Sequence, residues 1–450
     1  MRNKLLRRLA LVCAAAVLTC GLAGCGGTTP EAASSSAASA AAESTAFEPK
    51  LDTEKEVALE ASGFFGNFEA LDQVLNNFNE YYPNVTISYE QNNGDKLVEY
   101  LKNNPYVDII MTDDTNLRYP DWVDSYIADQ CADLTAEGID VSAVQPELLE
   151  ECTFDGKVLR IPFAENHVGM VVNKTLLEKE GLSVPTNYAD FLTTLEALKQ
   201  AGYTPIQGSE NSIYTELVYN MAMCMIGSDP KLLDALNNGD ESAVETLTPV
   251  FEKIEELKKK GYVDSRVNAE YPADNYDGAI LKFFEGDVPF WVCNTEKYSG
   301  MKKRESKSEA FSASPFEYAF IDVPMGDNGV YEYVEPWFGF SVNKNSDDYD
   351  YAVEFIRFLA QEEQLNTLAS VKGVPTATNN NTDARFDDIN SQPQVAVRYV
   401  NDGTVMNHVK DYFGHDAENC GKGEMTAEEA ARDYVARCAE TAREMAEAAQ

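Results

Sequence analysis

The stretch VALEASGFFGNFEALDQVLNNFNEYYPNVTISYEQ, residues 57–91, predicts a strand, a helix and a second strand in that order. Five of its first six residues are small or apolar, and the six predict a strand, with a loop at 63–67. Leu71, Val74 and Phe78 recur at helical spacing within a helix expected over 69–82, and Pro83 ends that helix. Apolar residues then alternate from 85 to 89, which predicts a half-buried strand.

The following residues extend this pattern. A helix is expected over 96–103 and a buried strand over 106–111, so the order is β-α-β-α-β and the fold class is α/β, with mostly parallel sheets flanked by helices. Further strands are expected at 168–172 and 288–293. Further helices are expected at 174–180, 188–200, 249–260, 348–363 and 426–449. Thr248 and Pro249 are read as the start of one helix, and Thr426 with Glu429 as a capping box for the last.

Composition excludes several classes of protein. The chain has 450 residues, enough for two or three domains, and a net charge of −39. A surface this acidic repels phosphate backbones, so we expect no nucleic-acid partner. The three histidines are His167, His408 and His415, and they show no paired metal-binding spacing, so neither a metal nor a cofactor is expected. The segment DNYDG at 274–278 lacks two carboxylates that a calcium loop of the EF-hand type needs.

The N-terminus has the pattern of an export signal. Basic residues precede an apolar run at 9–18, which is too short to span a bilayer comfortably, and Leu-Ala-Gly-Cys follows at 22–25. This resembles a bacterial lipobox, which implies a signal peptide at 1–24 and lipidation of Cys25 with palmitate among the acyl chains. An ordinary signal peptide with an incidental cysteine is the alternative. Residues 25–53, rich in Ser and Ala, are interpreted as a flexible tether at the extracellular face of the membrane.

Six cysteines lie beyond the signal and the lipobox. Two pairs, Cys131–Cys152 and Cys420–Cys438, could form disulfides in an exported protein. Free buried thiols are the equal alternative, because a body of this size needs no disulfide for stability. The other two of the six are Cys224 and Cys293.

Several segments, taken in order, resemble one transport family. They are FNEYYPNVTI at 78–87, GK at 156–157 with IPF at 161–163, VNK at 172–174, GYTPI at 202–206, PWFGFSVN at 336–343 and AVEFIRFL at 352–359. Together they resemble the extracellular sugar-binding proteins of ABC importers, the family that includes maltose-binding protein. The resemblance covers most of the chain after the tether.

This resemblance implies a two-lobed, type II periplasmic-binding-protein fold with the ligand cleft between the lobes. Lobe one is expected at 54–155 and 340–395, and lobe two at 156–339 and 396–450. The implied protein is a monomer that is no enzyme: it captures a sugar or oligosaccharide by hinge closure and delivers it to a membrane permease with a separate ATPase. This chain itself carries no phosphate-binding G-x-x-x-x-G-K-[ST] motif.

A neutral sugar is bound by aromatic rings on its apolar faces and by polar side chains on its hydroxyls. The candidates follow predicted strands, directly precede the strand expected at 168–172, or lie near a predicted lobe crossing: Phe64, Phe65, Asn67, Asp113, Asp114, Glu165, Asn166, His167, Asn294, Glu296, Glu335 and Trp337. Several have structural alternatives. Asp113 could cap a helix, His167 could equally be a packed histidine, and Trp291 is expected in the core rather than in the cleft.

Two other functions stay open. A surface glycoside hydrolase would need a pair of carboxyl groups across the sugar bond, and no strand-end pair is recognisable. A binding protein for a polyamine would use an anionic cleft, for which Asp113, Asp114, Glu165, Glu296 and Glu335 are available.

Overall fold

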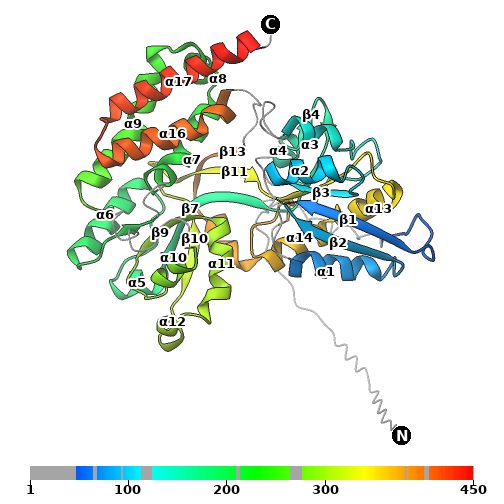
Figure 1. Cartoon of the computed structure of the whole chain (residues 1–450). Helices are drawn as coiled ribbons and strands as arrows, with labels where there is room; N and C mark the ends of the chain where they lie inside the picture. Colours follow the sequence, from blue (N-terminus) through cyan, green and yellow to red (C-terminus); the bar gives the residue numbers. More distant parts are fainter. Residues whose placement is uncertain are drawn as a thin grey trace, which may run out of the picture. The chain divides into compact units, whose positions relative to one another are not determined.

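The computed structural model describes residues 47–63, 68–92, 95–112, 124–208, 213–263, 276–380, 383–399 and 405–448. Residues 47–450 form one compact unit, distinct from residues 1–46. Within it the strands form two main sheets, each flanked by helices (Figure 1). No helix in these ranges is both long and apolar enough to cross a membrane.

The first sheet has the strand order β2-β1-β3-β12-β6. β1 is parallel to β2 and β3, whereas β12 is antiparallel to both β3 and β6. The sheets are therefore mixed rather than mostly parallel as expected, because a strand from late in the chain returns in the opposite direction. The bounds are β1 Val57–Gly63, β2 Val85–Gln91, β3 Ile109–Thr112, β6 Ile161–Pro162 and β12 Gly339–Val342.

Helices cover both faces of this sheet because the side chains of a strand alternate between its two faces. Ile109 and Met111 of β3 join one hydrophobic cluster, and Ile110 between them joins another. The first cluster includes residues of α1, α13 and α14, and the second includes residues of α2 and α3. These helices are α1 Phe68–Asn79, α2 Asp95–Asn103, α3 Asp124–Gln130, α13 Tyr349–Leu359 and α14 Glu362–Lys372; the short α4 Pro146–Glu150 and the hairpin of β4 Thr153–Phe154 and β5 Lys157–Val158 lie between them in sequence.

The second sheet has the order β13-β11-β7-β9-β8, with β10 also paired to β7. β7 is antiparallel to β9, β10 and β11, so this one long strand pairs with three others in the sheet. The bounds are β7 Glu165–Asn173, β8 Ile206–Gln207, β9 Phe290–Asn294, β10 Tyr318–Ile321, β11 Val330–Pro336 and β13 Gln394–Tyr399.

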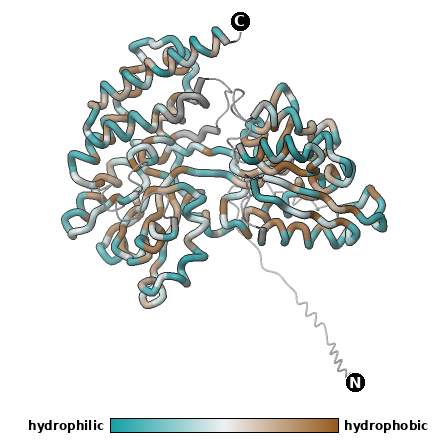
Figure 2. Tube along the Cα trace, in the orientation of Figure 1, coloured by the Kyte–Doolittle hydropathy of each residue, from teal (hydrophilic) through white to brown (hydrophobic). Residues whose placement is uncertain are grey.

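Two clusters also flank the second sheet. Met170 and Val172 pack into the larger one, and Val171 packs into the smaller one. Helices of the larger cluster are α5 Lys174–Lys179, α6 Tyr188–Gln200, α7 Ile213–Ser228, α8 Pro230–Asn238, α9 Glu241–Lys259, α16 Val405–Lys422 and α17 Ala427–Ala448. On the other side are α10 Tyr276–Phe283, α11 Thr295–Glu305, α12 Glu309–Ala313, the 3₁₀ turn η3 Ala384–Phe386 and α15 Asp387–Asn390. Figure 2 shows the long C-terminal helices alternating between hydrophilic and hydrophobic residues, as amphipathic helices do.

The chain passes between the two sheets at three places. β6 of the first sheet is followed directly by β7 of the second, and β11 of the second by β12 of the first. After α14 the chain returns to the second sheet, where Phe386 and Ile389 pack into its smaller cluster. The strand at 161–162, expected in lobe two, thus belongs to the first sheet. Residues 384–390, expected in lobe one, pack beside the second sheet.

Several expected elements differ from the structure. Pro249 does not start a helix but lies inside α9, whose N-cap is Asp240, because the amphipathic pattern from 241 onward outweighs one proline. The helix expected at 348–363 is two helices, separated at Ala360 and Gln361. The expected tether ends before residue 53, because Phe47 is buried against Tyr81 and Phe358. The capping box of Thr426 and Glu429 is confirmed.

The cysteines of the described residues are free. Cys131, Cys152, Cys224, Cys293, Cys420 and Cys438 are all buried thiols, so the structure has neither of the two considered disulfides. Burial raises the pKa of Cys420 and of Cys438 to about 12. Apolar packing, rather than covalent linkage, accounts for these positions.

Candidate functional site

Strand register brings several chain segments to one edge of the first sheet. β1 ends at Gly63 beside Met111 of β3, in parallel, so both strands leave the sheet at the same edge. β12 begins there as well, because Gly339 lies opposite Thr112 and Pro162. The carboxyl ends of β1 and β3 therefore lie beside the two direct crossings to the second sheet. This edge is the expected position for a ligand in an α/β protein.

Five predicted residues follow the ends of β1 and β3. They are Phe64, Phe65, Asn67, Asp113 and Asp114, and all lie outside the described residues, as does Cys25. Their role in binding stays a prediction.

Three other predicted residues meet where β7 and β11 pair. Asn166 lies opposite Glu335 in the antiparallel ladder, and Glu165 lies opposite Pro336. Thr295, at the start of α11, donates a 3.1 Å hydrogen bond to Asn166 Oδ1 and accepts one of 3.1 Å from the backbone N–H of His167. Gln145 donates to Glu165 from the first-sheet side. The polar side chains near the crossing thus come from both sides of it.

Asn294 and Glu296 lie at the start of α11, next to this crossing. Asn294 is the N-cap: its Oδ1 accepts a 3.1 Å hydrogen bond from the backbone N–H of Lys297. This structural role uses the amide oxygen that we expected to bind solute. Glu296 is exposed in the first turn, where its negative charge also suits the helix dipole.

Trp337 is enclosed in this structure. It is 5% exposed, stacks on Phe338 with ring centroids 4.1 Å apart, and its backbone N–H donates to Ala164. The ammonium of Lys372 lies 5.4 Å from the Trp337 ring centroid. Burial lowers the pKa of Lys372, partly offset by the charge of Glu296. No sequence pattern pointed to Lys372, because α14 carries it to the crossing only in the folded chain.

Trp291 lies in the core, as expected. It is buried in the smaller cluster of the second sheet and stacks on Phe283 with centroids 6.0 Å apart.

His167 lies inside a network of acids rather than at the surface. It is 3% exposed, and its Nε2 lies 2.9 Å from Glu165 Oε2. Burial alone would lower the pKa of His167, but the hydrogen bond to Glu165 and the charges of Asp322 and Glu332 raise it to about 9. Burial also raises the pKa of Asp322 and of Glu332. This environment matches the packed-histidine alternative.

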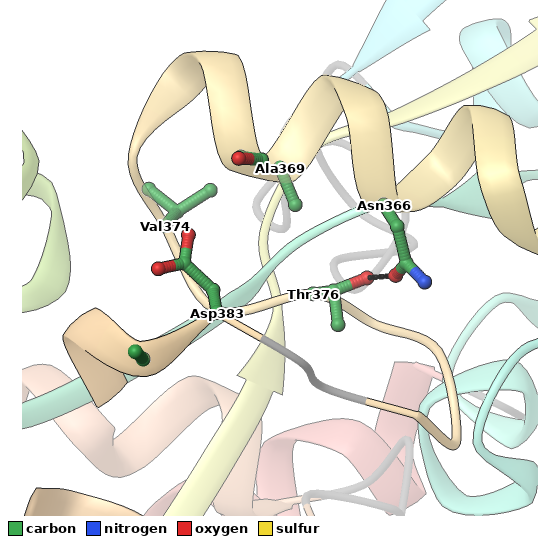
Figure 3. Close-up of a pocket in the computed structure, with 7 residues that line it drawn as sticks. Asn366, Ala369, Val374, Thr376 and Asp383 are labelled. Atoms are coloured by element: carbon green, nitrogen blue, oxygen red, sulfur yellow. Dashed lines mark hydrogen bonds between the residues drawn. The ribbon is translucent and has the colours of Figure 1, made fainter. Parts of the chain in front are cut away.

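A small pocket lies beside α14 and is lined by residues between 366 and 384. Figure 3 shows Asn366 and Ala369 of the helix facing Thr376, Val374 and Asp383 of the following segment. Its volume is about 270 Å³. Asn366 Oδ1 accepts hydrogen bonds from Thr376 and Thr378, and Asp383 pairs with Arg385. The polar atoms of this pocket thus already have hydrogen-bond partners within the chain.

A comparison of the sequence with known protein families shows which family this chain belongs to. The family model described as bacterial extracellular solute-binding protein matches residues 73–396, which include both direct crossings and every strand of the two sheets except β1 and the last residues of β13. The chain belongs to this family. The finding supports a binding role over the hydrolase alternative. A search of curated proteins found no match.

Solved structures show the same two-lobed α/β fold as this solute-binding protein. The sugar-binding protein MalE from Xanthomonas citri has a TM-score of 0.67 at 13% identity, covering 87% of this chain and 98% of that one. The cyclic α-maltosyl-1,6-maltose binding protein from Arthrobacter globiformis has 0.63 at 16%, covering 86% and 100%. The GacH receptor of Streptomyces glaucescens, solved with acarbose, has 0.63 at 16%, covering 87% and 99%.

Proposed function

We propose that this solute-binding protein captures a sugar or oligosaccharide and delivers it to the permease of an ABC importer, whose ATPase is a separate chain. The observation that carries the proposal is the meeting of polar side chains at the strand crossings, with Asn166 opposite Glu335 and Glu296 nearby on α11. Carboxylate and amide oxygens of this kind accept hydrogen bonds from sugar hydroxyls. The sugars named for the structural neighbours support the same class of ligand.

Capture by hinge closure follows from the connections between the sheets. The two lobes are proposed to follow the sheets, near the division at 54–155 with 340–395 and 156–339 with 396–450, adjusted at β6 and at residues 384–390. The three connections between the sheets then form the hinge, and rotation about them closes the lobes on the solute.

Membrane attachment is a second part of the proposal. Residues 1–24 are proposed as the signal peptide, Cys25 as the lipidated residue carrying palmitate, and the residues up to 46 as the tether of a monomer at the extracellular face. Several acyl chains on one cysteine hold a protein at a membrane far more firmly than one chain does. Cys25→Ser should move the protein from the membrane fraction to the medium and abolish labelling with palmitate. Retention of both would contradict lipidation at this residue.

Ligand class is tested by thermal unfolding of the purified protein against sugars, oligosaccharides and polyamines. Ligand that binds only the folded state at a hundredfold excess over its Kd adds about 2.7 kcal/mol of stability. We expect a rise in Tm with one sugar class, and chromatography should recover that sugar intact. A rise with polyamines alone would transfer the site to a cationic solute, and sugar breakdown would contradict a binding role.

Matched variants locate the site. Glu335→Gln replaces a carboxylate oxygen by an amide NH₂ and removes a charge, and Asn166→Ala removes an amide, so each should weaken the sugar-dependent rise in Tm. Glu80→Gln removes one exposed carboxylate far from it in the chain and should leave the rise unchanged. An equal effect of Glu80→Gln would point to the overall charge instead of the crossing.

A further inference from the structure

β7 changes its neighbour in the middle of its length. β11 pairs with it at His167, and β10 pairs with it from Met170 onward, so the ladder is interrupted between these points. At this gap the carbonyl of Val168 accepts a 2.8 Å hydrogen bond from Asn220 of α7. Asp322, just after β10, and Glu332, on β11, both approach His167 here.

The side chains of His167, Asp322 and Glu332 face one another, and two of them have polar atoms without a hydrogen-bond partner among the described residues. Nδ1 of His167 lies 4.0 Å from Asp322 Oδ1 and 3.9 Å from Glu332 Oε1. Both His167 Nδ1 and Asp322 Oδ2 are buried and make no hydrogen bond within the described part of the chain. His167 is 3% exposed and Asp322 is 1% exposed, so neither atom is satisfied by bulk water. Buried polar atoms of this kind normally have a partner.

The charges around the gap do not balance. Glu165, Asp322 and Glu332 supply up to three negative charges, and His167 is the one base among the described residues that contacts them. Buried charges are normally paired or bound to a metal. A divalent cation would compensate the excess.

The hydrogen-bond pattern is the one that holds a metal ligand in place. His167 Nε2 lies 2.9 Å from Glu165 Oε2, so an imidazole that donates from Nε2 and has released the proton on Nδ1 turns the Nδ1 lone pair toward the gap. Metal-binding histidines typically donate their second ring nitrogen to a carboxylate in this way. The other two acids also have outer partners: Asn220 donates to Asp322 Oδ1 at 3.3 Å, and Gln394 donates to Glu332.

We propose that His167, Asp322 and Glu332 bind one divalent first-row transition-metal ion, with zinc as the probe. One donor atom from each residue lies within 4.8 Å of the others. Donor atoms around zinc lie roughly 3.4 Å apart for bonds of about 2.0–2.2 Å, so small side-chain rotations would complete the site. Imidazole and carboxylate are both accepted by zinc, and three protein ligands leave one position for water. The ion would join β7 to β11 and to the end of β10 where their ladder is interrupted.

Zinc binding is tested on the purified protein without any sugar, so its outcome is independent of the proposed function. After treatment with EDTA, the protein is loaded with zinc chloride, and bound metal is measured by mass spectrometry and calorimetry. We expect one zinc ion per chain. His167→Gln and Glu332→Gln should each weaken binding at least tenfold, since each removes a ligand.

Two further variants test whether zinc binds at this site or at an exposed histidine elsewhere. His415→Gln removes an exposed histidine beside Asp416 and should leave zinc affinity unchanged. Gln394→Ala, at an exposed position, removes only the partner of Glu332, so it should weaken binding several-fold without affecting the core. Circular dichroism verifies that each variant is folded.

Two results would overturn the proposal. One is a wild-type protein that binds no stoichiometric zinc, or binds it equally well in folded His167→Gln and Glu332→Gln. The other is an infrared band of a protonated carboxyl that persists with zinc present and disappears in Asp322→Asn. That band would show that a proton, not a metal, neutralises the buried acids.

Discussion

Tyr82 donates a 2.6 Å hydrogen bond from its phenol to the buried carboxylate of Glu354. Tyr82 lies between α1 and β2, whereas Glu354 lies on α13, after the chain has returned from the second sheet. The same carboxylate accepts hydrogen bonds from Arg357 and from the backbone N–H of Lys50. One acid thus joins three segments that lie far apart in the chain.

Removing the Tyr82 hydroxyl should lower the free energy of unfolding. Tyr82→Phe leaves the ring in place but deletes a hydrogen bond to an ionised partner, which is worth roughly 1.5–3 kcal/mol. Urea unfolding should show a loss in that range. Tyr106→Phe, at a position 61% exposed, is the control and should change stability little. Equal losses in the two variants would disprove the role of this contact.

Glu354 also predicts how stability responds to acid. Burial would raise the pKa of Glu354, but hydrogen bonds from Arg357, Tyr82 and the backbone hold it below its usual value of 4.5. A carboxyl with a lowered pKa in the folded state stabilises the protein above its unfolded pKa and loses this effect as the pH falls through its folded pKa. Between pH 7 and pH 3, the wild type should therefore lose more free energy of unfolding than Glu354→Gln. Parallel curves would contradict this.

Pro249 should be a stabilising position for alanine. It lies on the exposed side of α9, inside the helix, where it cannot donate a backbone hydrogen bond. Pro249→Ala restores that donor and should add about 1–3 kcal/mol, read as a higher Tm. Ala243→Gly, a buried helical control, should lower it. An unchanged or lower Tm for Pro249→Ala would mean that the proline's restriction of the unfolded chain outweighs the missing bond.

Buried free thiols predict resistance to both reduction and labelling. A reducing agent should leave Tm unchanged, because the structure has no disulfide among its described cysteines. A thiol reagent should react slowly with the native protein, since burial raises the pKa of Cys293 and Cys420 and hides both sulfurs. Rapid labelling after urea is the positive control. A fall in Tm on reduction would instead indicate a disulfide.

Tryptophan fluorescence should report solute binding through one residue. Trp337 lies at the crossing from β11 to β12, whereas Trp291 lies in the smaller hydrophobic cluster of the second sheet. The third tryptophan, Trp122, lies outside the described residues, so it is first replaced by Phe in every protein compared. If hinge closure changes the surroundings of the crossing, solute should alter the emission of this Trp122→Phe background and of its Trp291→Phe derivative, but not that of its Trp337→Phe derivative. An unchanged response to solute after Trp337→Phe would show that the change in fluorescence does not come from Trp337.

Much of the fold was predictable because its signals are local. The spacing of Leu71, Val74 and Phe78 predicted α1, and the bounds expected for α6 agree with the structure. Local signals failed at Pro249 and at the break between α13 and α14, where packing along a longer amphipathic segment decides the boundary. The packing of Phe47 likewise depends on partners far along the chain.

The sequence by itself determined the α/β class, most elements and the resemblance to solute-binding proteins, and it placed Glu165, Asn166 and His167 just before the strand expected at 168–172, whereas the structure includes all three in β7. Only the tertiary structure decided that Asn166 lies opposite Glu335, that Asn294 caps α11, and that His167 meets Asp322 and Glu332 in a buried gap. The reason is physical. Helix and strand periodicity arise from neighbours a few residues apart, whereas strand register and side-chain clusters depend on which distant segments pack together.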